Sequence, residues 1–139
     1  MNNPAIITGG NHADHRGSIT FFNEFDMSPI KRFYIIENKN LEVKRGWRGH
    51  KIEQRWFYVE RGTFKIELVK ITDWLSPDPK TYIAEYILTD ADNQILHIPA
   101  GYATCLQCLE PKSKVFVYAD HDLDHAKNDD YLYPEDYFK

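Results

Sequence analysis

The chain has 139 residues, of which 42% are hydrophobic and 27% charged, and these shares are ordinary for one globular domain. They exclude a disordered chain, a collagen-like repeat and a coiled coil. The formal net charge is −4 at pH 7, whereas a general nucleic-acid binder needs a strongly basic face. We therefore expect no nucleic-acid partner.

The sequence also lacks the marks of a membrane or secreted protein. No hydrophobic stretch approaches the roughly 18 residues of a transmembrane helix, and the first residues do not have the basic and apolar regions of a signal peptide. Cys105 and Cys108 lie three residues apart in an apolar run typical of a strand, so their side chains point to opposite faces and should not form a disulfide. Reduced cysteines favour a cytoplasmic protein.

The elements predicted along the chain are strands. Aromatic residues make up 14% of the sequence and favour strands, whereas helical periodicity is scarce. Turn residues recur about every 8–12 positions, which is typical of a β-sandwich or a jelly-roll barrel. The predicted strands cover residues 5–8, 18–22, 31–37, 40–44, 54–60, 63–71, 81–88, 94–98, 103–109 and 114–119.

Two neighbouring strands in the middle of the chain are predicted to form a hairpin. In residues 63–71, Phe64, Ile66 and Leu68 alternate with more polar positions, which indicates one buried face. Residues 55–59 are more continuously apolar, as expected of a strand covered on both sides. Gly62 lies in the turn between them and is available for a positive φ.

Charge is distributed unevenly along the chain. Residues 44–61 hold six Lys or Arg against two Glu, whereas residues 120–139 hold seven Asp or Glu against two Lys. The first segment favours a small anionic ligand, and the second predicts a short, solvated acidic tail on a single domain spanning residues 1–139. Four aromatic side chains of this tail offer a way to wrap the barrel: Tyr131, Tyr133, Tyr137 and Phe138.

Two segments, residues 46–62 and 98–108, resemble the two motifs of the cupin superfamily, a double-stranded β-helix of jelly-roll topology. Those motifs supply three histidines and an acid to a metal. Here His50 matches the second histidine, but Arg48 stands at the first. Two further departures are Arg55 near the acid and Thr104 at the third histidine.

These departures change the chemistry that the cupin motifs imply. A guanidinium group stays protonated in proteins and has no lone pair for a metal, and two of them would repel a divalent cation. We therefore expect no metal and no cofactor. A pocket that contains Arg48, Arg55 and His50 should instead attract an anion.

The likeness narrows to the metal-free sugar-nucleotide cupins, the dTDP-4-dehydrorhamnose 3,5-epimerases and the dTDP-4-keto-6-deoxyhexose 3,4-ketoisomerases. It spans most of the chain, through residues 14–18, 44–51, 98–103 and 128–134. Residues 45–51 read Arg-Gly-Trp-Arg-Gly-His-Lys and look most like the Arg-Gly-x-His-x-His-Lys of the ketoisomerases. The resemblance implies a homodimer that binds a nucleotide-sugar and moves protons next to its keto group.

The resemblance also implies roles for individual residues. His50 is the predicted general base, and Arg48 is the predicted cation that stabilises the enediolate oxygen. Tyr118 and Tyr102 are the candidate proton donors. The remaining candidates bind substrate: Arg16 and Arg45 through its diphosphate, with Lys51 ranked after them, Arg55 as a cation of the anion-binding pocket, and Tyr34 or Phe33 by stacking on thymine.

Other functions stay open because of the departures from the family pattern. Arg48 replaces one of the two ketoisomerase histidines, which leaves a non-catalytic cupin that binds a nucleotide-sugar or a small anion as the main alternative. A metal-dependent cupin is the weaker one. In the epimerases an additional C-terminal segment carries an acid that supports the catalytic histidine, and here Asp14 or Glu53 is the candidate for that role.

Overall fold

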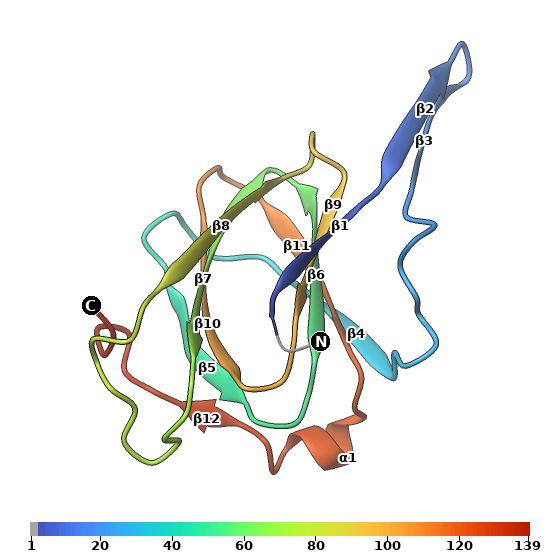
Figure 1. Cartoon of the computed structure of the whole chain (residues 1–139). Coiled ribbons are helices and arrows are strands. Elements are labelled where there is room, and N and C mark those ends of the chain that lie inside the picture. Colours follow the sequence, from blue (N-terminus) through green and yellow to red (C-terminus); the bar gives the residue numbers. More distant parts are fainter. Residues whose placement is uncertain (1–2) are drawn as a thin grey trace.

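A computed structural model describes residues 3–139, which form short strands and one short helix (Figure 1). In this range no helix has the length and hydropathy needed to cross a bilayer. The prediction of an all-β chain is confirmed. The strands are β1 (Ala5–Thr8), β2 (Gly10–Asp14), β3 (Gly17–Phe21), β4 (Arg32–Ile36), β5 (Arg45–His50), β6 (Arg55–Arg61), β7 (Thr63–Lys70), β8 (Ala84–Thr89), β9 (Gln94–Ile98), β10 (Tyr102–Cys108), β11 (Lys114–Ala119) and β12 (Tyr131–Leu132), and the helix is α1 (Leu123–Ala126).

Two antiparallel sheets make the barrel. One has the strand order β1-β9-β6-β11-β4 and the other the order β12-β5-β10-β7-β8. Neighbours in each sheet are often distant in the sequence, as expected of a jelly roll rather than a meander. Strands β2 and β3 pair only with each other, and this hairpin extends away from the barrel (Figure 1).

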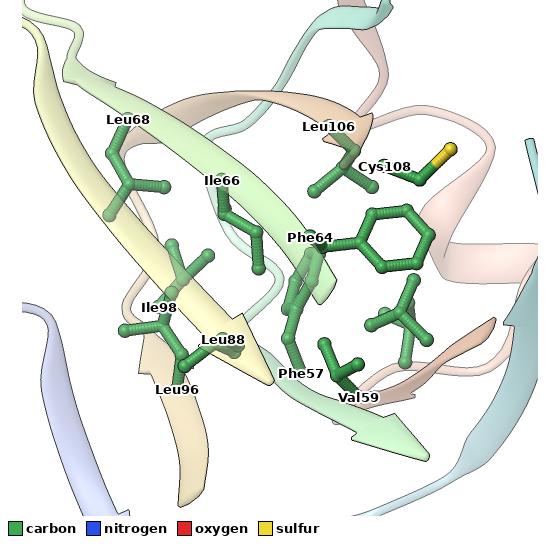
Figure 2. Close-up of a cluster of buried hydrophobic side chains, with 12 residues drawn as sticks. Phe57, Val59, Phe64, Ile66, Leu68, Leu88, Leu96, Ile98, Leu106 and Cys108 are labelled. Atoms are coloured by element: carbon green, nitrogen blue, oxygen red, sulfur yellow. The ribbon is translucent and has the colours of Figure 1, made fainter. Parts of the chain in front are cut away.

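A hydrophobic core fills the space between the two sheets. Phe64, Ile66 and Leu68 of β7 all face it, as their alternation predicts. Fully burying one such side chain contributes about 1.5–3 kcal/mol. Figure 2 shows the cluster, whose buried members are Phe57, Val59, Phe64, Ile66, Leu68, Leu88, Leu96, Ile98, Leu106, Cys108, Val115 and Val117.

The predicted hairpin is wrong, because β6 pairs with β9 and β11 in one sheet whereas β7 pairs with β8 and β10 in the other. The turn between β6 and β7 crosses from one sheet to the other, as in a jelly roll. The positive φ expected of Gly62 and the predicted state of the cysteines are confirmed. Strands β6 and β7 are joined through Gly62, whose φ is +77°. Trp56, on the face of β6 away from the core, is buried as well. Cys108 belongs to the barrel core whereas Cys105 packs in a second cluster, and both are free thiols.

The predicted strand over residues 40–44 is wrong, and the strand lies immediately after it, in β5. The Asn40 side chain accepts hydrogen bonds from the backbone N–H groups of Glu42 and Val43, at 3.0 and 3.2 Å, and so closes a local turn. Strand β5 contains Gly46 and Gly49, which read as breakers in the sequence. The short strands β2 and β12 were likewise absent from the prediction.

The acidic C-terminal segment is packed on the barrel through its aromatic residues, so the prediction of a solvated tail is wrong and the alternative, that it wraps the barrel, is confirmed. Strand β12 pairs with the edge of β5. Phe138 belongs to a second hydrophobic cluster on the outer face of the β5-β10-β7 sheet, together with Trp47 and Val69, and Tyr133 and Tyr137 pack against it. The aromatic side chains therefore outweigh the charge of the segment, because they bury hydrophobic surface of the sheet.

Candidate active site

The candidate site is a pair of adjoining cavities where the edge strand β4 of one sheet approaches β5 of the other. Their volumes are about 440 and 270 Å³. Tyr34, Arg48 and Arg55 line both cavities. The larger cavity is also lined by Ile35, Ile36, Arg45, Gly46, Thr104, Leu106 and Leu132, and the smaller one by Arg32, His50, Leu123, Ala126, Lys127 and Asp130.

Strand alternation explains why these side chains meet. Arg48 and His50 of β5 lie two residues apart and share the inner face of the sheet, whereas Trp47 between Gly46 and Arg48 packs in the outer cluster. On the facing sheet, Arg32 and Tyr34 of β4 alternate with the exposed Phe33 in the same way.

His50 is held in one protonation state and one orientation. Its side chain is almost fully buried, and Nδ1 lies 2.7 Å from the backbone oxygen of Asp129. A carbonyl oxygen can only accept, so Nδ1 carries the proton and Nε2 carries the lone pair. Among the buried side-chain nitrogen and oxygen atoms of residues 3–139, Nε2 of His50 is the one without a hydrogen-bond partner.

The pKa of His50 is lowered to about 4, chiefly because burial disfavours the imidazolium and also because the Arg55 guanidinium repels it. The hydrogen bond to Asp129 and the charges of Glu53 and Asp129 oppose this shift only in part. The imidazole is therefore neutral at pH 7, with its Nε2 lone pair available as a base or an acceptor.

Glu53 joins the cationic groups of the site. This carboxylate is almost fully buried and forms ion pairs with Arg32 at 3.0 Å and with Arg55 at 2.9 Å. Both guanidinium groups lie over the ring of Tyr34, at 5.2 and 5.8 Å from its centroid. The two arginines are thus fixed beside a flat aromatic surface, an arrangement suited to an anionic ligand that carries a ring.

Two further arginines are oriented by polar partners. Nε of Arg45 donates to Oδ1 of the buried Asn38 at 3.2 Å. Arg48 pairs with Asp130 at 3.0 Å, and about half of its side chain stays exposed. Guanidinium groups fixed in this way are suited to hold phosphate oxygens or a developing oxyanion.

Five of the predicted site residues line the two cavities and Glu53 is paired with their arginines, whereas the others, among them the exposed Phe33 and Asp14, lie elsewhere. Arg45, Arg48, His50, Arg55 and Tyr34 line the two cavities.

Arg16 lies at the turn of the β2–β3 hairpin, paired with Asp14 rather than with the cavities, and Lys51 is exposed beside the site. Tyr102 faces the barrel interior, packed against the core, and does not line either cavity. Tyr118 lies on the outer face between Phe25 and Phe33, because its neighbours Val117 and Ala119 take the inner positions of β11. It therefore does not face the cavities of its own chain.

Three charged residues that pair with the groups of the site were not given a role from sequence: Arg32, Asp129 and Asp130. For Arg32 the sequence did carry a signal, because it lies two residues before Tyr34 in a predicted strand and so shares its face. The other two carry no local sign, because their partners are far away in the sequence. Over residues 3–139, no three His, Cys, Asp or Glu side chains form a group that could hold a metal ion.

The comparison with protein families decides where this chain belongs. Residues 2–139 match the family described as FdtA: WxcM-like, C-terminal. The chain belongs to the FdtA family. A comparison with curated proteins finds no match.

Solved structures show which fold this FdtA-family chain shares. A double mutant of the 3,4-ketoisomerase QdtA from Thermoanaerobacterium thermosaccharolyticum, in complex with TDP, matches with 26% identity and a TM-score of 0.71, over 99% of this chain and 93% of that one. The TDP-quinovose 3,4-ketoisomerase WlaRB from Campylobacter jejuni matches with 20% identity and a TM-score of 0.72, over 99% and 98%. The dTDP-4-dehydrorhamnose 3,5-epimerase from Bacillus anthracis matches with 17% identity and a TM-score of 0.71, over 88% and 76%. The predicted cupin fold is confirmed.

Proposed function

We propose that this protein is an isomerase that acts on a dTDP-4-keto-6-deoxyhexose and moves the keto group between carbons 4 and 3. The observation that carries the proposal is the neutral imidazole of His50, which lines a cavity together with arginines and whose Nε2 has no hydrogen-bond partner. A general base needs a free lone pair, and Nε2 of His50 has one.

In the proposed reaction, Nε2 of His50 removes the proton on carbon 3. The electrons of that C–H bond form a double bond between carbons 3 and 4, and the carbonyl oxygen on carbon 4 becomes an oxyanion beside Arg48. The oxyanion on carbon 4 takes up the proton that the hydroxyl group of carbon 3 releases, and the proton removed from carbon 3 is made good by one delivered to carbon 4. The product has a ketone on carbon 3 and a hydroxyl group on carbon 4. Of the two predicted tyrosines, Tyr102 is the proposed proton donor: it does not line either cavity, but it is the cross-strand register partner of His50, so the two side chains leave the sheet on the same face.

The remaining cavity residues are proposed to bind the nucleotide. Arg45 and Arg55 line the larger cavity and supply positive charge for the diphosphate. Tyr34 supplies a ring on which thymine can stack. The dTDP ligand itself is inferred from the sugar-nucleotide enzymes described above that share the fold, two of which are in complex with TDP.

The choice of ketoisomerase over epimerase rests on the extent of the match. WlaRB is covered over 98% of its length, whereas the Bacillus anthracis epimerase is covered over 76%. The pattern of residues 45–51 supports the same choice. We further propose that the protein works as a homodimer in the cytoplasm. The exposed aromatic surface of β4 supports the dimer, and the free cysteines support a reducing compartment.

Incubation with dTDP-4-keto-6-deoxyglucose in D₂O, followed by NMR of the sugar protons, tests the reaction. We expect deuterium at carbon 3 and a new keto-sugar. Because a positioned base contributes about 100- to 10,000-fold, the His50→Asn variant should be slower by at least about 100-fold. His97→Asn is the matched control, because His97 is a partly buried histidine that stacks on Trp56 outside both cavities. Unchanged activity in His50→Asn would refute the assigned base.

A non-catalytic binder of nucleotide-sugars is the second candidate. The observation that favours it is Arg48, which stands at a ketoisomerase histidine and is already paired with Asp130. Such a protein would show saturable line broadening of the sugar-nucleotide signals with no deuterium exchange. Exchange at both carbon 3 and carbon 5 would indicate epimerase chemistry instead.

A further inference from the structure

Asp129 connects two parts of the site that are far apart in the sequence. It lies in the C-terminal strap, which we define as residues 122–132, the segment with α1 and β12 that crosses one end of the barrel (Figure 1). Its side chain is buried, with 4% of the residue exposed. Oδ1 accepts from the backbone N–H of Lys51 at 2.8 Å, and Oδ2 accepts from those of Ile52 and Glu53 at 2.9 and 2.8 Å. Three amide donors therefore compensate the buried charge.

The backbone of the same residue contacts the imidazole of His50. The Asp129 carbonyl oxygen accepts the Nδ1–H of His50 at 2.7 Å. A neutral imidazole has two tautomers, and the one with a free Nε2 lone pair needs an acceptor at Nδ1. The carboxylate holds Asp129 against the turn that follows β5, so it fixes where the carbonyl oxygen lies.

The nearest carboxylate does not replace this contact. Oε2 of Glu53 lies 3.9 Å from Nδ1 of His50, which is beyond hydrogen-bonding distance. Both Glu53 oxygens are already paired, Oε1 with Arg32 and Oε2 with Arg55. Glu53 therefore holds the arginines, and the orientation of His50 depends on Asp129.

The residue after Asp129 reaches the second predicted catalytic group. Asp130 pairs with Arg48 at 3.0 Å, and β12 continues by pairing Tyr131 with Gly49 and Leu132 with Arg48. We propose that Asp129 is a positioning residue for the reaction proposed above: its carboxylate anchors the strap, and its carbonyl thereby keeps His50 in the tautomer whose Nε2 carries the free lone pair. The proposal rests on the proposed function for its catalytic consequence, but its structural part stands without substrate.

The variants are Asp129→Asn and Asp129→Ala, with Asp120→Asn as the matched control. An asparagine keeps the size of the side chain but its NH₂ group cannot accept, so at most two of the three backbone donors stay satisfied. Asp120 is also a carboxylate that anchors this turn, because it accepts from the backbone N–H of Gln54 at 2.8 Å. It makes no contact with His50 and faces Gln54 and His121 instead.

The first readout is the tautomer of His50, by ¹⁵N NMR of substrate-free protein labelled on its six histidines, with His50→Asn used to assign the signal. We expect one Nδ1–H tautomer in the wild type and in Asp120→Asn, and a mixture of tautomers in Asp129→Asn. A single wild-type tautomer in a folded Asp129 variant would overturn the proposal. An equal change in Asp120→Asn would overturn it too, because loosening of the turn alone would then explain the effect.

The second readout is turnover of dTDP-4-keto-6-deoxyglucose. Misplacing a catalytic group costs up to about 100-fold, so kcat of Asp129→Asn should fall by about 10- to 100-fold with a smaller change in KM, while Asp120→Asn keeps its kcat. Circular dichroism identifies an Asp129→Ala protein that does not fold, and Asp129→Asn then carries the test. Wild-type inactivity together with the expected tautomer change would refute the proposed reaction and leave the positioning of His50 established.

Discussion

His50 shows how burial sets the chemistry of a single residue. An exposed histidine has a pKa near 6.5, but here burial and Arg55 lower the pKa to about 4. A base with a lower pKa accepts a proton less readily, yet it is in its unprotonated form across the neutral range. The cavity thus offers a weak but fully available base, fixed in one tautomer by Asp129.

The lowered pKa also makes the stability of the fold depend on pH. In the unfolded chain His50 binds a proton below about pH 6.5, whereas in the folded protein it does so only below about pH 4. Protonation therefore favours the unfolded chain. The stability contributed by His50 is complete above pH 6.5 and is lost as the pH falls toward 4. The difference of the two pKa values corresponds to about 3 kcal/mol in the free energy of unfolding.

Urea unfolding of wild type and His50→Gln at pH 7 and pH 4.5 measures this contribution. The free energy of unfolding should fall between the two pH values in both proteins, because carboxylates also titrate there. The fall should be larger in the wild type by about 2–3 kcal/mol. Equal falls in the two proteins would contradict the pKa assigned to His50.

Strand β5 shows what local sequence patterns cannot express. Its glycines, Gly46 and Gly49, are needed because a neighbouring segment comes too close for a side chain. A Cβ on Gly46 would lie 2.6 Å from the Cα of Cys105 and 2.7 Å from the carbonyl oxygen of Thr104, both on β10. A glycine in a strand often marks such a close approach of two backbones.

The Gly46→Ala variant tests this packing. The atoms that the new methyl group meets belong to the backbone of β10, so the two strands must separate, and overpacking of this kind costs about 1–3 kcal/mol. We expect thermal unfolding to show this loss of stability. We also expect ¹⁵N NMR to show a smaller fraction of His50 in the Nδ1–H tautomer, because β5 carries both residues. A free energy of unfolding within about 0.5 kcal/mol of the wild type would show that the strands separate freely.

The same strand explains which parts of the fold and site could be predicted. The alternation of Phe64, Ile66 and Leu68 is local and correctly predicts a buried face. Arg48 and His50 lie two residues apart on one strand, and this local spacing places both at the lining of one cavity. The contact between His50 and Asp129 joins positions 79 residues apart, and it depends on how the strap crosses the barrel. Contacts of this kind follow from topology, and periodicity does not encode them.

At the scale of the whole molecule, the β2–β3 hairpin is the part least supported by the barrel. Within residues 3–139 it pairs with no other strand, and Ile19, with 64% of the residue exposed, shows how little of it is covered. An isolated two-stranded hairpin is marginally stable in water. On the barrel, Phe33 of the edge strand β4 is 58% exposed and stacks with Phe116 and Tyr118 on one outer face. Hydrophobic surface of this kind is typical of a protein interface.

The proposed homodimer would cover both surfaces, and light scattering coupled to size-exclusion chromatography measures it. We expect twice the mass of one chain for the wild type. Phe33→Asp and Ile19→Asp should each shift the protein toward the monomer, because a charge buried in an interface is costly. Leu75→Asp is the matched control, since Leu75 is 97% exposed on a loop of the barrel. A wild-type monomer at micromolar concentration, or dissociation by Leu75→Asp as well, would contradict an interface built on these surfaces.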